Sequence, residues 1–170
     1  MVAMMAFLER AIESDETSQD VERALASSGA ELLVSVADQL AAGTARETPQ
    51  DESLATYANR LKREDGLIDW RAAAPSIHNL VRGLVPWPHA FSFLNGTRFI
   101  VLATRAVDAG GAHAMPGTIV RAHGDELLAA AGDGLVQILR IQPEGRRALT
   151  AREFLAGHAV RVGSVFGPPA

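Results

Sequence analysis

The side chains that could act on a ligand are mainly basic, and they are concentrated in the second part of the chain. Residues 1–60 carry four Arg, no Lys and eleven acidic residues, whereas residues 61–170 carry twelve basic and nine acidic residues. The whole chain of 170 residues has a formal net charge of −4, which argues against a uniformly basic nucleic-acid binder. The asymmetry instead indicates two regions with different partners, and it allows a local basic face on the second.

Residues with catalytic or metal-binding chemistry are few. The chain has no cysteine, which excludes disulfides, thiolate zinc sites and a cysteine nucleophile. Its five histidines, at positions 78, 89, 113, 123 and 158, do not have metal-ligand spacing. His78 and Asn79 lie between apolar residues of an expected helix, which favours a structural or surface role over catalysis. Gly132–Gly134 predicts a turn, because no strand-to-helix context makes it a phosphate loop.

The acidic part of the chain is expected to be helical. Thr17 is a suitable N-cap for a helix that ends at Gly29, and apolar spacing predicts a second helix over 30–42. Residues 44–53 are polar and predict a loop. The apolar run over residues 1–8 predicts a buried strand, since it lacks the charge pattern and cleavage site of a signal peptide. No segment is long enough to span a bilayer, so no membrane partner is expected.

The second part is expected to combine helices with a small sheet. A helix over 72–83 must end before Pro86–Pro88, and a capping box over Thr150–Glu153 opens a short helix that Gly157 ends. Asn95–Gly96 is a hairpin turn. The predicted strands are 91–94, 98–103, 117–121, 127–130 and 136–141. Five short strands with regular turns predict an α+β chain that contains a small β-barrel of the oligonucleotide-binding (OB) type.

Several motifs, in this order, resemble those of the methionyl-tRNA formyltransferase family. They are Pro49-Gln50, the run from Leu61 to Trp70 (LKREDGLIDW), the run from Ile77 to Leu84 (IHNLVRGL) followed by Pro86-Trp87-Pro88, and the tail from Gln142 to Gly157. The resemblance extends from about Ile12 to Phe166. It implies a helical remnant of a Rossmann-like catalytic domain over 1–48, an interdomain linker over 49–71 and an OB-like C-terminal domain over 72–170.

That family transfers a formyl group from formyl-tetrahydrofolate to initiator methionyl-tRNA in translation initiation. Such a transfer needs a base and donors for the oxyanion, and the family's catalytic Asn, His and Asp lie in motifs with no counterpart in this sequence. The folate site belongs to the same missing region. The resemblance therefore implies a cytoplasmic tRNA-binding half that binds no folate and does not catalyse the reaction alone. Initiator methionyl-tRNA and a separate catalytic half are the partners to consider.

The resemblance also implies that a basic surface of the C-terminal domain holds the tRNA, because Arg and Lys neutralise phosphates. The candidate tRNA-binding residues are Arg60, Lys62, Arg63, Arg82, Arg98, Arg140, Arg146, Arg147 and Arg152. Arg82 has a competing role, since a basic side chain in the last turn of a helix complements its dipole. Trp87 could stack on a base, but its place between two prolines favours packing at a domain boundary.

Two alternatives remain open. Formyltransferases that act on amino-sugar nucleotides, and the hydrolase part of formyl-tetrahydrofolate dehydrogenase, share this architecture. The run from Arg82 to Pro88 and the tail from Gln142 to Gly157 favour the tRNA enzyme. The other alternative is a stand-alone module that binds tRNA or a protein without chemistry. Binding of initiator tRNA at two salt concentrations separates these classes, because phosphate contacts weaken steeply with salt.

Overall fold

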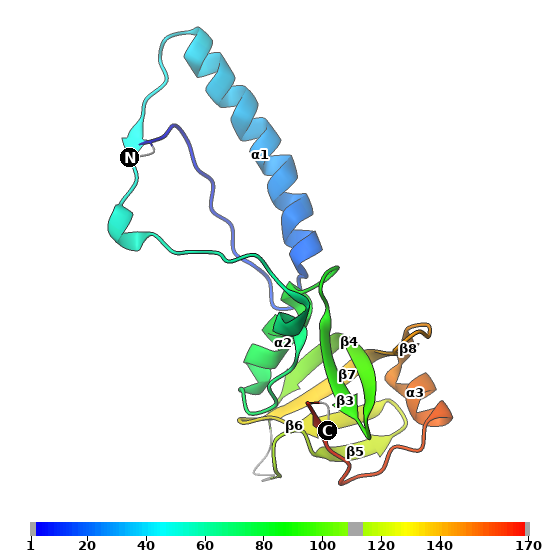
Figure 1. Cartoon of the computed structure of the whole chain (residues 1–170). Helices are drawn as coiled ribbons and strands as arrows, with labels where there is room; N and C mark the ends of the chain where they lie inside the picture. Colours follow the sequence, from blue (N-terminus) through cyan, green and yellow to red (C-terminus); the bar gives the residue numbers. More distant parts are fainter. Residues whose placement is uncertain (1–2, 109–113, 169–170) are drawn as a thin grey trace. The chain divides into compact units, whose positions relative to one another are not determined.

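The computed structural model describes residues 3–108 and 114–168 of the chain (Figure 1). The chain divides into two compact units, residues 1–60 and residues 61–170. The division falls inside the segment 49–71 that the sequence predicts as a linker. Among the described residues, no helix has the length and apolar character needed to cross a membrane.

The N-terminal unit contains one long helix, α1 (Ser18–Ala41). It starts as predicted, because the Thr17 hydroxyl accepts from the Asp20 amide and the Asp20 carboxylate accepts from the Thr17 amide at 3.0 Å. The predicted break at Gly29 is wrong, since α1 runs through it without interruption. A glycine costs a helix interior only about 1 kcal/mol relative to alanine, which the surrounding helix formers offset. The predicted end of the second helix near residue 42 is confirmed, since α1 ends at Ala41 and Gly43 follows in the left-handed region at φ +66°.

The other elements of this unit are short. Strand β1 (Ala3–Met4) pairs antiparallel with β2 (Thr48–Pro49). The segment η1 (Glu52–Leu54) is a single 3₁₀ turn whose N-cap, Asp51, accepts from the Ser53 amide. The predicted loop over 44–53 therefore includes one short strand and part of a 3₁₀ turn.

The prediction of a buried strand over residues 1–8 is wrong for the described part of that run, and Met1 and Val2 lie outside the described residues. Only two residues form a strand, and Phe7 is 68 % exposed. The reason lies in the rest of the unit, because no residue of α1 is buried. The apolar side chains of α1, such as Leu33 and Val34, are exposed as well, so the helix and the run do not bury each other.

The C-terminal unit is built on a curled antiparallel sheet. In sequence order its strands are β3 (Ala90–Leu94), β4 (Thr97–Val107), β5 (Ile119–His123), β6 (Glu126–Ala130), β7 (Leu135–Pro143), β8 (Leu149–Thr150) and β9 (Phe166–Gly167). The five predicted strands are confirmed with slightly shifted bounds, whereas β8 and β9 were not predicted. The order across the sheet is β5-β6-β7-β4-β3-β9, and β8 pairs with β7.

Hydrogen bonds also connect the two ends of this sheet. The Phe166 amide donates to the Gly117 carbonyl at 2.8 Å, and the Ile119 amide donates to the Ser164 carbonyl at 2.8 Å. Phe166 begins β9, which pairs with β3 on its other side, and Ile119 begins β5. The chain around β9 therefore links the two edge strands, and the sheet curls around one interior.

Strands β3 and β4 form the predicted hairpin. Both residues of the Asn95–Gly96 turn have positive φ, +50° and +76°, which gives the twist that a two-residue turn requires. The register places Phe93 opposite Arg98. These two side chains face outward, because the alternate residues Ser92 and Leu94 of β3 are buried.

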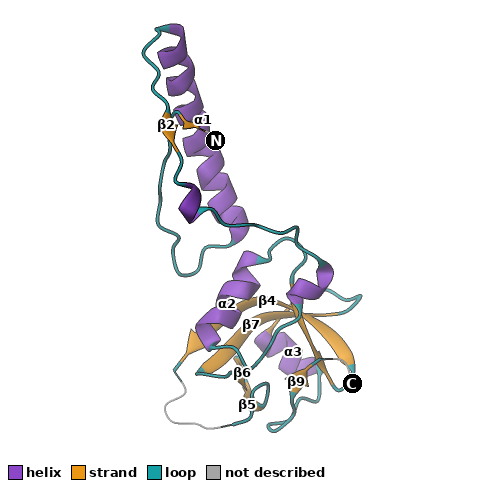
Figure 2. Cartoon of the chain, turned by 60° about the vertical axis from the view of Figure 1, so that its left-hand side comes forward, coloured by secondary structure: helices purple, strands orange, loops and turns teal. Residues whose placement is uncertain are grey.

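Two helices pack on the sheet, α2 (Ala74–Gly83) and α3 (Ala151–Gly157), and both are confirmed close to their predicted bounds. Helix α2 packs mainly on β4, and α3 packs on β7 and β8 (Figure 1 and Figure 2). Helix α2 buries Ile77 and Val81, and α3 buries Phe154. The capping box of α3 is the predicted one, since the Thr150 hydroxyl and the Glu153 carboxylate each accept from the other's amide.

Trp70 attaches the segment before α2 to the sheet. Its indole Nε1 donates to the Ser92 hydroxyl at 2.9 Å, and that hydroxyl donates to the Gly167 carbonyl at 3.1 Å. The indole ring also stacks on Phe166, with 5.4 Å between the ring centroids. Trp70 and Ser92 are both buried. One side chain thus holds together the preceding segment, β3 and β9.

Candidate nucleic-acid interface

A groove of about 720 Å³ lies in the C-terminal unit where three of its segments meet. The start of β4, the turn after β7 and the end of α3 contribute its walls. Its lining residues are Thr97, Phe99, Pro143, Glu144, Arg146, Arg147, Leu149, Gly157 and His158. Two of the nine predicted tRNA-binding residues, Arg146 and Arg147, therefore face one hollow.

The turn after β7 fixes the backbone that carries Arg146. The Arg146 amide donates to the Pro143 carbonyl at 3.0 Å, and Gly145 between these two residues has φ +69°. The Gln142 side-chain amide donates to the Arg146 carbonyl at 2.8 Å. Among the described residues, Arg146 has no carboxylate within ion-pair distance. The turn therefore presents an unpaired guanidinium from a well-fixed backbone.

Arg147 is held differently, by an ion pair with Glu153 at 3.1 Å. Glu153 also accepts from the Thr150 amide at 2.8 Å and the Thr150 hydroxyl at 3.1 Å. These two bonds and the Arg147 guanidinium lower the pKa of the Glu153 carboxyl below its ordinary value. The carboxylate that caps α3 thus also fixes Arg147 beside the groove.

Arg98 adjoins the same groove through Glu144. Its guanidinium lies 4.1 Å from the centroid of the Phe91 ring and 3.2 Å from the Glu144 carboxylate. Cations stack on aromatic faces in this way when the ring and the charge share a surface. Glu144 in turn lines the groove beside Arg146. The structure therefore brings three predicted residues together at this place: Arg98, Arg146 and Arg147.

Two further predicted residues lie around β8 and α3. Arg152 makes a two-pronged bond to Asp125, at 2.6 Å and 2.7 Å, which lowers the pKa of the Asp125 carboxyl. Arg140 is exposed on β7 and lies opposite Thr150 of β8. Among the described residues it has no ion-pair partner, so its charge remains available to a ligand.

The other predicted residues do not line this groove. Arg82 lies in the last turn of α2, where its Nε donates to the Asn79 side-chain oxygen at 2.8 Å. Lys62 and Arg63 are exposed at the start of the 3₁₀ segment η2 (Arg63–Gly66). Arg60 is the last residue of the N-terminal unit and is exposed.

The groove also includes functional candidates that the sequence did not single out. Glu144 and His158 lie beside the arginines, and Glu153 orients one of them. The His158 Nδ1 is 3.0 Å from the Phe154 carbonyl, and its ring stacks on the Phe154 ring with centroids 4.5 Å apart. The Pro143–Arg146 sequence, with its Pro and Gly, is a turn signal that indicates where the groove begins.

Residue types that can serve in catalysis or metal binding, such as histidine, have other contacts in the described part of this chain. His78 Nδ1 lies 3.2 Å from the buried Thr104 hydroxyl, which agrees with the expected structural role. Within residues 3–108 and 114–168 no three His, Cys, Asp or Glu side chains gather in a way that could hold a metal ion, and His113 lies outside that part. Trp87 is 50 % exposed.

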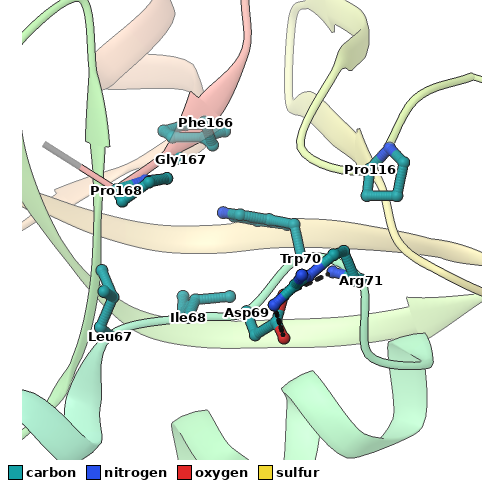
Figure 3. A pocket seen from close by; sticks show the side chains of 9 residues that line it. All are labelled: Leu67, Ile68, Asp69, Trp70, Arg71, Pro116, Phe166, Gly167 and Pro168. Atoms are coloured by element: carbon teal, nitrogen blue, oxygen red, sulfur yellow. Dashed lines mark hydrogen bonds and ion pairs between the residues drawn. The ribbon is translucent and has the colours of Figure 1, made fainter. Parts of the chain in front are cut away.

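A second pocket, of about 470 Å³, lies beside Trp70 (Figure 3). Its walls include Ile68, Trp70 and Phe166, which are buried hydrophobic residues. The two charged groups at this pocket, Asp69 and Arg71, bind each other at 2.8 Å and 2.9 Å. Their mutual bond lowers the pKa of the Asp69 carboxyl. This pocket therefore combines apolar side chains with one ion pair whose two members bind each other.

Comparison with known proteins shows the family to which the C-terminal unit belongs. Residues 60–159 match the family described as "Formyl transferase, C-terminal domain". The methionyl-tRNA formyltransferase of Geotalea uraniireducens is 42 % identical over 156 residues, which are 92 % of this chain and 49 % of that protein. The one from Thermodesulfovibrio yellowstonii is 37 % identical over 91 % of this chain and 49 % of its own length. The chain thus spans about half the length of these relatives.

Solved structures show the same fold at low identity. HypX from Aquifex aeolicus aligns with a TM-score of 0.61 and 16 % identity, over 86 % of this chain and 27 % of HypX. A HypX complex with tetrahydrofolic acid aligns with a TM-score of 0.53 over 71 % of this chain and 21 % of HypX. Because a domain match covers most of the C-terminal unit, the chain belongs to the formyl transferase family, and it is similar to the C-terminal half of methionyl-tRNA formyltransferases.

Proposed function

We propose that this chain is the tRNA-binding C-terminal part of a methionyl-tRNA formyltransferase, which acts in translation initiation in the cytoplasm. The observation that carries the proposal is the 42 % identity to a protein of that name across 92 % of this chain. The groove with Arg146 and Arg147 provides the chemistry, since guanidinium groups bind phosphates through two parallel hydrogen bonds. The bound molecule in this proposal is initiator methionyl-tRNA.

We also propose the domain organisation that the sequence resemblance implies. The connection of β5 to β9 supports an OB-like barrel in residues 72–170, because closure removes the free edges of such a sheet. Similarity over 156 residues extends well beyond the matched C-terminal domain. This supports residues 1–48 as the end of a Rossmann-like catalytic domain and 49–71 as the linker. A separate polypeptide with the catalytic half remains a proposed partner.

The co-substrate of the proposed reaction is formyl-tetrahydrofolate, and the pocket beside Trp70 does not fit it. A pterin ring is recognised through hydrogen bonds to polar groups inside a mainly apolar pocket. This pocket has apolar side chains, but its charged groups Asp69 and Arg71 already bind each other. We therefore assign the folate to no residue of this chain.

Binding of a tRNA should depend strongly on salt, and the structure indicates how strongly. Among the described residues, five of the nine proposed contacts have no carboxylate partner: Arg60, Lys62, Arg63, Arg140 and Arg146. Each phosphate contact contributes about 0.9 to the slope of log affinity against log salt. Raising salt from about 50 to 200 mM should therefore weaken binding about 3.5-fold per contact, or about 500-fold for five contacts.

Filter binding of an initiator tRNA transcript to the purified chain at those two salt concentrations tests the proposal. The expected result is tight binding at low salt and a loss of two to three orders of magnitude at high salt. A variant with Arg60, Lys62 and Arg63 changed to Gln removes three of the five contacts. Its slope of log affinity against log salt should be smaller by about three. Absence of tRNA binding at low salt would overturn the proposed function.

A further inference from the structure

We propose that the groove between the turn after β7 and the end of α3 holds one backbone phosphate of the bound tRNA. In this site Arg146 is the direct contact, and Glu144 is a competing carboxylate that limits the affinity. The inference rests on the proposed function, because it takes tRNA as the source of the phosphate.

The turn after β7 presents Arg146 from a backbone that is already held in place. Three backbone groups of the turn are engaged, through the bond from the Arg146 amide to Pro143, the bond from Gln142 to the Arg146 carbonyl, and the bond from the Glu144 amide to the Arg98 carbonyl at 3.2 Å. None of these bonds uses the Arg146 side chain. A fixed backbone reduces the conformational freedom that the guanidinium loses when it binds a phosphate.

The groove has hydrogen-bond donors on more than one wall. His158 is not one of these donors. Its Nδ1 lies 3.0 Å from the Phe154 carbonyl, which only accepts, so Nδ1 carries the hydrogen and the Nε2 of the neutral ring has only a lone pair. Thr97 contributes a hydroxyl from the start of β4, and Arg147 lies beside the turn. Several polar groups of different elements thus converge on one volume.

Glu144 lines the groove and pairs with Arg98 at 3.2 Å. Its side chain is 62 % exposed, and exposed ion pairs of this kind are weak. A phosphate that enters the groove meets the repulsion of this carboxylate, and it competes with it for Arg98. Removing the charge of Glu144 should therefore free Arg98 for the phosphate and raise the affinity.

The experiment compares tRNA binding by four variants of the full chain across a salt series. Arg146→Ala should weaken binding about eightfold at 0.1 M salt and lower the salt slope by about one, as expected for the loss of one phosphate contact. Glu144→Gln should strengthen binding several-fold. The controls are Arg105→Ala and Arg161→Ala, which remove exposed arginines outside the groove and should change the affinity less than Arg146→Ala does.

The outcomes separate this inference from the function on which it rests. If the unchanged chain binds tRNA but Arg146→Ala behaves like the two controls, the phosphate site is overturned and the proposed function stands. If Glu144→Gln binds no tighter than the unchanged chain, the competing role of Glu144 is overturned. If the unchanged chain does not bind tRNA, both proposals fall together. Circular dichroism of each variant verifies that the side-chain changes leave the fold intact.

Discussion

The bond between Trp70 and Ser92 offers a sharp test of how the C-terminal unit is held together. Phenylalanine at position 70 retains an aromatic ring for the stack on Phe166 but has no indole N–H. The buried Ser92 hydroxyl would keep its own bond to Gly167 and lose the one that it accepts. Leaving a buried polar group short of a partner costs about 1–3 kcal/mol.

The smaller ring adds a packing term to that cost. Phenylalanine has less apolar surface than tryptophan, and a difference of about 40 Å² corresponds to about 1 kcal/mol. The expected loss in the free energy of unfolding for Trp70→Phe is therefore about 2–4 kcal/mol. Trp87 provides the matched control, because it is 50 % exposed. Trp87→Phe should change stability by less than about 0.5 kcal/mol.

Urea unfolding measures both variants, with the remaining tryptophan as the fluorescent probe. The chain has only two tryptophans, so each variant retains a single reporter in the C-terminal unit. A double-mutant cycle of Trp70→Phe with Ser92→Ala isolates the hydrogen bond, and the coupling should be about 1 kcal/mol. If Trp70→Phe and Trp87→Phe unfold at the same urea concentration, then the buried bond and stack do not stabilise this unit.

Three further predictions concern backbone and charge. Gly132→Ala should destabilise by more than about 2 kcal/mol in urea, because its Cβ would overlap the carbonyl oxygen of Arg71, whereas Gly157→Ala has open space and should be tolerated. Gly29→Ala should raise helicity by circular dichroism and stabilise α1 by about 1 kcal/mol; a loss of helicity would mean that the helix breaks there. Glu153 has a lowered pKa in the folded chain, so its stabilising effect is complete above its ordinary value of about 4.5 and disappears as the pH falls through the lowered one. Glu153→Gln should therefore flatten the acid limb of a stability–pH curve, and an unchanged limb would contradict this.

The features that the sequence predicted correctly depend on residues close together in the chain. The Asn95–Gly96 turn requires positive φ at both positions, which these residue types favour. The capping boxes at Thr17 and Thr150 join residues three positions apart. Short-range rules of this kind locate helices and hairpins without knowledge of the fold. The same rules failed at Gly29, where the helix propensity of many neighbours outweighs one unfavourable residue.

The features that the sequence did not predict depend on contacts between distant positions. Strand β9 pairs with β3, and the bond from Ser92 to Gly167 joins residues 75 positions apart. A strand of two residues has no periodicity to reveal it. The apolar run at residues 1–8 illustrates the reverse case, because apolar character alone does not specify what covers it. Phe7 is 68 % exposed even though its sequence environment resembles a buried strand.

The candidate interface shows why counting cations overstates a binding site. The sequence supplies nine basic candidates, but three of the guanidinium groups are engaged by carboxylates at 6, 27 and 46 positions along the chain. These are Arg147, Arg152 and Arg98. A phosphate can bind one of these guanidinium groups only after it displaces the carboxylate that is already bound there. The displaced carboxylate stays on the same surface and its negative charge is no longer neutralised. Paired arginines therefore contribute less to the salt dependence of binding than unpaired ones do. The salt slope of tRNA binding should therefore reflect mainly the contacts of the unpaired basic residues, whose number depends on the fold and not on the composition.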